Sequence, residues 1–530
     1  MKLSKIQTSI LFLILLIVVS FLYNYQKILF YPPFSVHYWR QSDCLSITLN
    51  YYQENLSFFT PKIHWTSPTG DNYTISEFPV IYYGVAQLWK VFGQKEFIFR
   101  LVNLLFVFAG LFSLFRLSLA YLKDNFWAIY IPLFLFTSPI LVYYTNNFMA
   151  DAPAFGLALS ASYFYWKYYQ KKKWTHLLAA ILFISLAGLL KISSLILFTA
   201  FLSLSLIETI PQWIKKQLTT RQVLLKIFPF LIVLVIIGAW YIYARHFTKI
   251  HNSGIFLQSI YPIWELDAAK IHMILDSLYW QLLPAFFNKK VLTLTLLLGL
   301  SSLFISPKNN KWIINLYLIS LFGIISFIIL WFKAFDVHDY YLTNLLFIVP
   351  FSLLLFLGTL KSKFSKIFRH WSLKLIATTV LLFLVYQTMF INRIKYNAHD
   401  AWLSADLIEK KGSVDYFANK QKDYNETLKA LEEITPYLRE IGISRTDLVY
   451  STPDYTINHT LYLMDQRGFT EYGYVPYKGV EKTNDRIEYF KQLGAKYLIV
   501  NADKYTKYID EKYLSNCIGT FQNVKIYKIE

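Results

Sequence analysis

Apolar residues form eleven long runs between residues 8 and 391, separated by short polar segments. A helix needs about 20 apolar residues to cross a hydrocarbon core about 30 Å thick. The pattern therefore predicts a polytopic α-helical membrane protein with about 11 transmembrane helices. The predicted spans are 8–30, 96–121, 126–145, 152–169, 175–190, 192–209, 225–244, 291–306, 311–332, 341–360 and 373–391.

Basic residues beside these runs predict their orientation, because cytoplasmic loops of membrane proteins carry an excess of Lys and Arg. The clusters Lys171–Lys173 and Lys215–Lys216 must then share the inner side. The 175–209 stretch, which has the length of one long helix, is therefore predicted to be two. This places Lys191 between two helices at the outer face.

The first run is predicted to anchor the chain with its N-terminus in the cytoplasm. It follows Lys2 and Lys5 and leads into Tyr31-Pro32-Pro33 without the small-x-small cleavage site of a signal peptide. Three longer segments are then outside: 31–95, 245–290 and the tail from 392. The first of them contains an amphipathic stretch, Phe78–Phe92, which is predicted to lie along the membrane interface. We expect an integral protein of the bacterial inner (plasma) membrane.

The tail, 392–530, differs from the rest of the chain in charge and in periodicity. It holds 20 Lys and Arg residues and 20 Asp and Glu residues, so it is neutral. Two domains are therefore predicted: a transmembrane domain, 1–391, and a C-terminal soluble, extracytoplasmic α/β domain whose role the residues do not indicate. The helix-like runs are Tyr424–Ile441 and Asp485–Leu493, and the strand-like runs are Asp447–Ser451, Tyr497–Val500 and Val524–Ile529.

Composition narrows the class of protein. Hydrophobic residues make up 55% of the chain and charged residues 16%, whereas soluble domains have about 25% charged residues. A soluble enzyme, a disordered chain and a fibrous protein are thus excluded. The net charge of +19 lies entirely in the apolar part, where it marks cytoplasmic loops rather than a nucleic-acid surface. Two cysteines, Cys44 and Cys517, are too few for a disulfide framework, and their pairing is left open.

Several polar residues stand at predicted outer ends of the spans. Each has an ordinary explanation: a solvated loop for Asp43, helix capping for Glu77 and Asp151, and snorkelling to the interface for Lys191. Together they suggest more, because carboxylates take protons or hold divalent cations, whereas cations suit a lipid-linked phosphate. Further candidates beside them are Trp39, Arg40, Arg245, His338, Asp339 and Tyr340.

At these positions the sequence resembles a known family. The run from Glu77 through Pro79 and Tyr82 to Arg100 is similar to the "P-x-x-Y…K-x-F-G…E-F-x-x-R-L" signature of membrane glycosyltransferases of the GT-C type. The most similar groups are the protein O-mannosyltransferases and the lipid A aminoarabinose transferases. The resemblance covers roughly residues 1–390 and continues at Thr137-Ser-Pro139, Asp151-Ala-Pro153 and Gly188-Leu-Leu-Lys191.

The sequence departs from the family pattern at three places. Ile192 replaces a glycine after Lys191, and the late segment Asp339-Tyr340-Tyr341 lacks an arginine. Cys44 follows Asp43 where many members have Glu, which leaves the acceptor open.

The resemblance implies transfer of a sugar from polyprenyl phosphate to an acceptor hydroxyl, with inversion, on the non-cytoplasmic face. Asp43 corresponds to the first-loop base and Asp151 to the second acidic residue. Glu77 corresponds to a residue near a divalent metal or the phosphate. We expect Lys191 and Arg245 to bind the lipid phosphate. The residues expected to bind substrate are Trp39, Arg40, Tyr82, His338, Asp339 and Tyr340.

The expected partners are a polyprenyl-phosphate-linked sugar, a protein, lipid or glycan acceptor, and membrane lipids, with no nucleic acid. The alternative function is a polytopic transporter or lipid flippase, and a non-enzymatic assembly protein is a third hypothesis. Transporters place ionisable groups near the midplane and often contain inverted repeats, whereas here the charges lie at helix ends and no repeat is evident. If the chain is a glycosyltransferase, we expect Asp43, Asp151 and Lys191 to line one cavity that opens to the outer face.

Overall fold

The computed structural model describes residues 4–67, 69–253, 255–256, 260–307, 310–398, 411–472 and 483–529. Parts of the predicted outer segment 245–290 and of the tail, namely 254, 257–259, 399–410 and 473–482, lie outside the described residues. The described chain divides into two compact units. The first comprises Met1–Leu29, Arg100–Ile242 and Ser259–Asn392, and the second comprises Phe30–Phe99, Tyr243–Gln258 and Arg393–Glu530.

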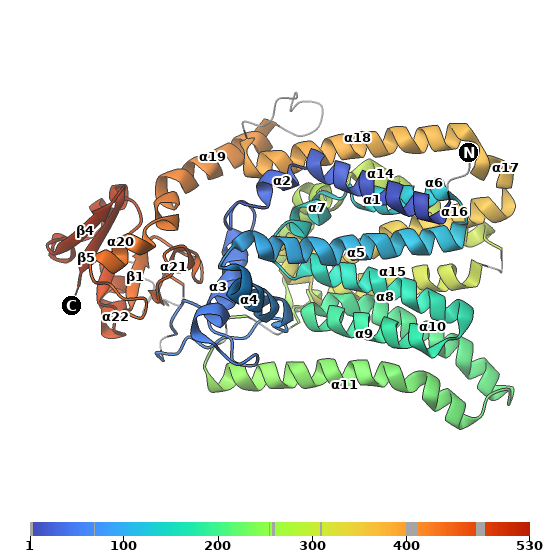
Figure 1. Ribbon diagram of the computed structural model, residues 1–530, viewed down its shortest axis with the longest axis horizontal. Coiled ribbons are helices and arrows are strands. Elements are labelled where there is room, and N and C mark those ends of the chain that lie inside the picture. Colours follow the sequence, from blue (N-terminus) through green and yellow to red (C-terminus); the bar gives the residue numbers. More distant parts are fainter. Residues whose placement is uncertain are drawn as a thin grey trace. The chain divides into compact units, whose positions relative to one another are not determined.

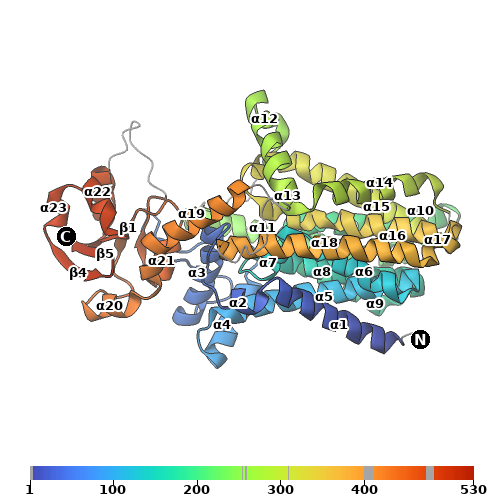
Figure 2. The same cartoon turned by 90° about the horizontal axis from the view of Figure 1, so that it is seen from above.

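The first unit is a bundle of apolar helices, and its long helices run roughly parallel to one another in both views (Figures 1 and 2). Neighbouring helices pack in pairs, including α8 with α9, α10 with α15 and α14 with α16. The helices that lie in or enter this unit are α1 (Lys5–Leu22), α2 (Tyr25–Ile28), α5 (Glu96–Leu122), α6 (Asn125–Leu135), α7 (Pro139–Thr145), α8 (Asp151–Lys171), α9 (Trp174–Leu190), α10 (Leu195–Ile214), α11 (Thr220–Ile250), α12 (Ala268–Ser277), α13 (Leu283–Phe286), α14 (Lys289–Ile305), α15 (Lys311–Leu330), α16 (Ile348–Lys363), α17 (Ser365–Arg369) and α18 (Trp371–Tyr396).

Every predicted span overlaps one of these helices or a bent pair of them. Within the described ranges, seven helices are long and apolar enough to cross a membrane, or up to nine if each of two bent pairs is one span. The pairs are α6 with α7, bent by 78°, and Ala268–Phe286 with α14, bent by 85°. The prediction of an integral, polytopic helical protein is confirmed, whereas the number of 11 spans stays a prediction.

The 175–209 stretch is two helices, as the distribution of basic residues predicted. The break falls at Lys191, whose backbone is extended (φ −150°, ψ 120°) between α9 and the short 3₁₀ helix η1 (Ile192–Ser194). The side chain of Asn344, in the 3₁₀ helix η6 (Asp339–Phe347), exchanges hydrogen bonds with Ser193 and Ser194 at 2.9 and 3.0 Å. These contacts hold the break against η6 and fix the position of Lys191.

Two glycines allow α5 and α8 to approach closely. A Cβ atom added to Gly110 would lie 2.5 Å from the Cα atom of Gly156, and one added to Gly156 would lie 2.4 Å from the carbonyl oxygen of Phe106. Because these obstacles are backbone atoms, no side-chain rotation removes them. The crossing therefore requires residues without a side chain.

The second unit contains the tail and its five-stranded sheet. The strands are β1 (Val449–Thr452), β2 (Gly468–Phe469), β3 (Tyr497–Val500), β4 (Cys517–Phe521) and β5 (Val524–Lys528), in the order β2-β1-β3-β5-β4. Strand β1 runs parallel to β2 and β3, whereas β5 is antiparallel to β3 and β4. The helices of this unit are α3 (Tyr38–Glu54), α4 (Val80–Phe92), α19 (Lys411–Thr427), α20 (Thr435–Glu440), α21 (His459–Leu463), α22 (Thr483–Gln492) and α23 (Glu511–Leu514).

The predicted α/β class of the tail is confirmed, with one correction in its helices. The helix-like run Tyr424–Ile441 is interrupted, because α19 ends at Thr427 and α20 begins at Thr435 with Pro436 in its first turn. Proline lacks a backbone N–H and is tolerated there because the first N–H groups of a helix have no partner inside it. Cys44 and Cys517 are both free thiols.

The first outer segment and the tail belong to the same compact unit. Trp65 forms a parallel bridge with Gly468 at the edge of the sheet, and the backbone N–H of Thr66 donates to the Gly468 carbonyl at 2.8 Å. On α3, the Glu54 carboxylate pairs with Arg445 at 2.8 Å and Arg467 at 2.5 Å. One boundary between the compact units, after Asn392, falls beside the predicted boundary at residue 391, and the second unit also contains Phe30–Phe99 and Tyr243–Gln258.

Candidate active site

Helix α3 contains Asp43, the predicted general base. Asp43 is completely buried. Its Oδ1 accepts a hydrogen bond from Asn458 Nδ2 at 2.5 Å, and its Oδ2 lies 3.6 Å from Arg40 Nη1. Among the residues that the structure describes, Oδ2 has no hydrogen-bond partner. One oxygen of the carboxylate is thus held, and the other retains its capacity to accept a proton.

Arg40 is bound more closely by Glu77 than by Asp43. Its Nη2 donates to both Glu77 oxygens, at 2.8 and 2.7 Å. The hydroxyls of Ser76 and Tyr82 donate to the same carboxylate, Tyr82 at 2.9 Å. The guanidinium also lies over the ring of Phe256, 4.5 Å from its centroid. Glu77 therefore neutralises Arg40, and Asp43 receives only part of its attraction.

This arrangement sets the protonation of Asp43. Burial raises its pKa to about 7, because the loss of water penalises the charged form more than Arg40 stabilises it, and the Glu77 and Asp454 carboxylates add repulsion. A general base works best when its pKa lies near the operating pH. The geometry therefore suits Asp43 to remove a proton from a substrate.

The tail supplies two neighbours of this helix that the sequence did not indicate. Besides Asn458, His459 places its Nδ1 2.6 Å from Ser42 Oγ. Burial lowers the pKa of His459 to about 3, so its ring is neutral. Since these contacts join residues more than 400 positions apart, no local pattern in the sequence identifies them.

The first unit contains a second polar cluster. Asp151 is the first residue of α8, as expected from Pro153 in the first turn, and Lys191 Nζ lies 3.3 Å from its Oδ1. The ammonium group is 5.3 and 5.6 Å from the ring centroids of Tyr340 and Tyr341. A lysine beside aromatic rings and one carboxylate, with its side chain 10% exposed, is a cation held in place at the end of apolar helices.

Residues of neighbouring helices position this cluster. The Tyr144 hydroxyl donates to Asp339. Arg100, fully buried in α5, donates to the Asn146 carbonyl and lies over the ring of Phe148, 4.0 Å from its centroid. Asn103, one turn further along α5, donates to the carbonyls of residues 147 and 149 at 2.7 and 3.1 Å. The arginine of the E-F-x-x-R-L motif therefore shapes the loop that leads into Asp151.

The predicted site residues fall into two clusters, one in each unit. Asp43, Arg40, Glu77 and Tyr82 come together in the second unit, and Asp151, Lys191 and Tyr340 in the first. That Asp43, Asp151 and Lys191 meet at one cavity stays a prediction.

Three other predicted site residues have different surroundings. The ring of Trp39 contacts that of His37, with centroids 5.8 Å apart. His338 stacks on Tyr340 at 5.4 Å. Arg245 is an exposed residue of α11. The substrate-binding and phosphate-binding roles of these residues stay predictions.

No group of three or more His, Cys, Asp or Glu side chains that suits a metal ion occurs in the described part of the chain. Glu77, the expected metal ligand, is engaged by Arg40 instead. The expected divalent cation therefore stays a prediction, for which the described residues offer no ligand set.

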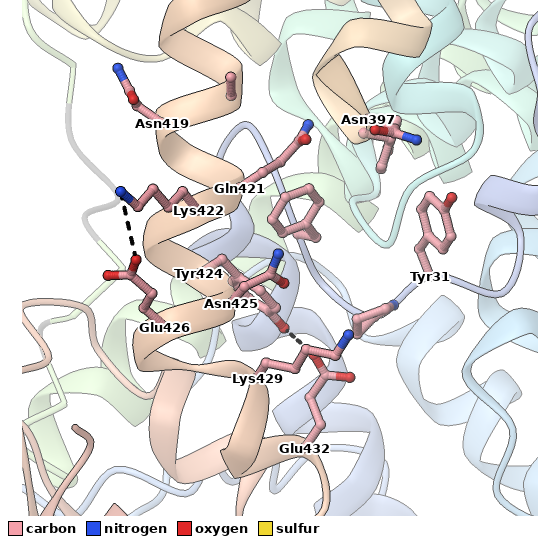
Figure 3. A pocket seen from close by; sticks show the side chains of 14 residues that line it. Tyr31, Asn397, Asn419, Gln421, Lys422, Tyr424, Asn425, Glu426, Lys429 and Glu432 are labelled. Carbon is pink, nitrogen blue, oxygen red and sulfur yellow. Dashed lines mark hydrogen bonds and ion pairs between the residues drawn. The ribbon is translucent and has the colours of Figure 1, made fainter. Parts of the chain in front are cut away.

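A pocket of about 800 Å³ lies elsewhere in the second unit, between the segment that follows residue 30, the end of α18, and α19 (Figure 3). Tyr424 in its wall donates to Glu432 at 2.7 Å. The ring of Tyr424 lies 6.3 Å from that of His459, which connects this wall with the surroundings of α3. The predicted site residues do not line the pocket.

The chain is similar to known proteins in part of its sequence and in its fold. A family model described as dolichyl-phosphate-mannose-protein mannosyltransferase matches residues 76–245, which include Glu77, Asp151, Lys191 and Arg245. The chain is also similar to crystal structures of ArnT from Cupriavidus metallidurans in the apo state and bound to undecaprenyl phosphate. The TM-score is 0.57 for both, with 12% and 11% identity, and the alignments cover 98% of this chain and 97% of theirs.

This chain has the ArnT fold. The predicted resemblance is confirmed: the mannosyltransferase family model matches residues 76–245, and the fold is similar to that of ArnT over nearly the whole chain. A comparison with curated protein sequences finds no match. At 12% identity the likeness to ArnT concerns the fold, and a shared fold does not by itself imply a shared function.

Proposed function

We propose that the chain is a membrane glycosyltransferase that moves a sugar from a polyprenyl-phosphate donor to an acceptor hydroxyl. The observation that carries the proposal is the buried Asp43 carboxylate, with a pKa of about 7 and one oxygen that accepts no hydrogen bond from the described residues. The family match and the ArnT fold support the transferase over a transporter or flippase. One of the ArnT structures is bound to undecaprenyl phosphate, which supports a donor of this chemical class.

In the proposed reaction Asp43 acts as the general base of a direct displacement. Its Oδ2 takes the proton of the acceptor hydroxyl as that oxygen attacks the anomeric carbon. The bond between this carbon and the phosphate oxygen breaks at the same time, and polyprenyl phosphate leaves with the electron pair. Attack opposite the leaving group inverts the anomeric centre. General-base assistance of this kind contributes about 10²–10⁴-fold.

The leaving phosphate needs a cation, and Lys191 is the candidate that the structure holds most firmly. Its ammonium lies between Asp151 and the rings of Tyr340 and Tyr341. A charge fixed in a water-poor site stabilises the negative charge that develops on the phosphate more strongly than a mobile one does. The exposed Arg245 is proposed as a second phosphate-binding residue.

The proposed orientation places the reaction outside the cytoplasm of a bacterial cell, in its inner membrane. The basic loops that contain Lys171–Lys173 and Lys215–Lys216 would face the cytoplasm with the N-terminus. Asp43, Lys191 and the tail would then lie on the opposite side. Cysteine-accessibility labelling at an exposed tail residue such as Tyr416 tests this orientation.

The function is tested by reconstituting the chain in lipid vesicles with polyprenyl-phosphate-linked hexose or pentose and an extract of cell-envelope acceptors. The proposal predicts sugar on the acceptor and free polyprenyl phosphate in equal amounts. Movement of the intact donor between leaflets without sugar transfer would support a flippase and contradict the proposal. Mass spectrometry of envelope glycans from a strain that lacks the chain identifies the acceptor, which is a protein, lipid or glycan.

A further inference from the structure

The tail contributes a side chain directly to the candidate base. Asn458 and Asp43 are both fully buried, and the Asn458 amide donates to Asp43 Oδ1 at 2.5 Å. The adjacent contact between His459 and Ser42, at 2.6 Å, ties the same two elements together. Both contacts lie within the second unit.

Asn458 is held in place before any substrate binds. It precedes α21, and its carbonyl accepts the backbone N–H of Tyr462 at 2.9 Å. The Asp454 carboxylate accepts the backbone N–H groups of Thr456 and Thr460 at 2.8 and 2.9 Å and the Thr460 hydroxyl at 2.7 Å. The turn that presents the amide is therefore fixed by its own hydrogen bonds, independently of Asp43.

An amide in this position has a specific effect on a carboxylate. It cannot ionise, so it donates to Oδ1 at every pH, and it favours the charged form because a carboxylate accepts hydrogen bonds more strongly than a carboxylic acid. It also fixes the plane of the carboxylate, which determines where Oδ2 points. A base that is held in one orientation reacts more often than one that samples several.

We propose that Asn458 is a positioning residue for Asp43, holding Oδ1 so that Oδ2 is the atom that takes the proton from the acceptor hydroxyl. The proposal rests on the proposed function and gives the tail a part in the reaction. The alternative is that the contact only fastens the tail to α3.

The pH dependence of transfer distinguishes these roles, and several groups besides Asn458 influence Asp43. Those that surround it are Arg40 and Cys44 on its own helix, Glu77 and Tyr82 in or before α4, and Asp454, His459 and Tyr472 in the tail. Asn458→Leu changes none of these residues and adds no charge. A shift of the profile in Asn458→Leu is therefore attributable to the lost hydrogen bond.

The test compares Asn458→Leu with Gln53→Leu in vesicles that contain the polyprenyl-phosphate sugar donor. The Gln53 amide donates to Asp465 at 2.9 Å, so it is another amide–carboxylate hydrogen bond between α3 and the tail. The proposal predicts that Asn458→Leu lowers kcat by about 10–100-fold, moves the acidic limb of the pH profile to higher pH and leaves the KM for the donor within about twofold. The limb should not move in Gln53→Leu.

A conservative variant keeps the test informative if Asn458→Leu folds poorly. In Asn458→Asp the second carboxyl shares a proton with Asp43 and can donate the same hydrogen bond. This variant should therefore retain more of kcat than Asn458→Leu near neutral pH. An unshifted limb in both Asn458 variants, or equal losses in Asn458→Leu and Gln53→Leu, would overturn the positioning role. Absence of transfer by the wild type would instead contradict the proposed function.

Discussion

One guanidinium nitrogen of Arg40 donates to both carboxylate oxygens of Glu77, at 2.8 and 2.7 Å. Asp43, three residues along the same helix, is 3.6 Å from the other terminal nitrogen. The cation is thus neutralised by Glu77, and the pKa of Asp43 is set mainly by burial. In this arrangement Glu77 acts through Arg40 to keep Asp43 basic.

Glu77→Gln tests this relationship. Without the Glu77 charge, Arg40 attracts Asp43 more strongly and the repulsion from Glu77 disappears, so the pKa of Asp43 falls below about 7. The acidic limb of kcat/KM against pH should move to lower pH, and the rate at its plateau should fall because the base is weaker. Glu440→Gln, at an exposed position of α20, is the control. A limb at the same pH in Glu77→Gln and wild type would refute the coupling.

Asp43→Asn should stabilise the protein in a pH-dependent way. In the unfolded chain the Asp43 carboxyl has its ordinary pKa of 3.8, whereas burial raises its pKa to about 7 in the fold. Folding therefore favours the protonated form, and the cost of the buried charge grows as pH rises from about 3.8 to 7. The thermal midpoint of Asp43→Asn should exceed that of wild type at pH 8 and match it near pH 4. The exposed Asp485→Asn is the control, and equal midpoints at pH 8 would show that the buried charge costs nothing.

Lys191→Met should weaken use of the donor. Loss of a charge-assisted contact of about 1.5–3 kcal/mol to the lipid phosphate corresponds to a decrease of about 10–150-fold in kcat/KM. Lys191→Arg keeps the charge and should retain more activity than Lys191→Met.

The matched control for this change is the exposed Lys173→Met. Because Lys191→Met also leaves Asp151 without this ion-pair partner, its thermal midpoint is measured alongside the rate of transfer. Full activity of a folded Lys191→Met would exclude the phosphate-binding role.

The close crossing of α5 and α8 predicts an unequal response of two glycines to the same substitution. In Gly156→Ala the new Cβ would lie 2.4 Å from a backbone oxygen, whereas Gly238 in α11 has nothing within 4 Å of the same atom. Gly156→Ala should lower the thermal midpoint and the yield of folded protein in detergent. Gly238→Ala should leave the yield unchanged and shift the thermal midpoint by no more than a few degrees. Similar midpoints for the two variants would mean that the helices do not cross as closely as described.

Much of the first unit could be predicted from the sequence. Apolar runs of spanning length identify helices almost independently of tertiary contacts, because a chain in lipid must satisfy its backbone hydrogen bonds internally. The break at Lys191 followed from charge alone, since the lysine clusters on both sides of the 175–209 stretch had to share a face. The start of α8 at Asp151 followed from Pro153, which suits only the first turn of a helix.

The second unit was less predictable, for physical reasons. Helix α3 has no side-chain cap, and the residue before it, His37, is in the left-handed conformation (φ 51°), so no start signal precedes Asp43. Many of its buried positions are polar, so the sequence of α3 does not show the apolar stripe by which an amphipathic helix is recognised. Asn458 donates a hydrogen bond to Asp43, although 415 positions separate the two residues in the sequence. Such a contact depends on how the tail folds against α3, which no spacing along the chain encodes.

The central claim is that Asp43 is the base of a sugar transfer. Its most direct test is the rate at which Asp43→Asn, wild type and Asp485→Asn transfer sugar from polyprenyl phosphate to the acceptor in vesicles. Asn keeps the size of the side chain and can accept the hydrogen bond from Asn458, but it cannot take a proton. We predict that Asp43→Asn transfers about 10²–10⁴-fold more slowly while binding the donor as wild type does, and that Asp485→Asn is unaffected. Turnover by a folded Asp43→Asn within a few-fold of wild type would contradict the account.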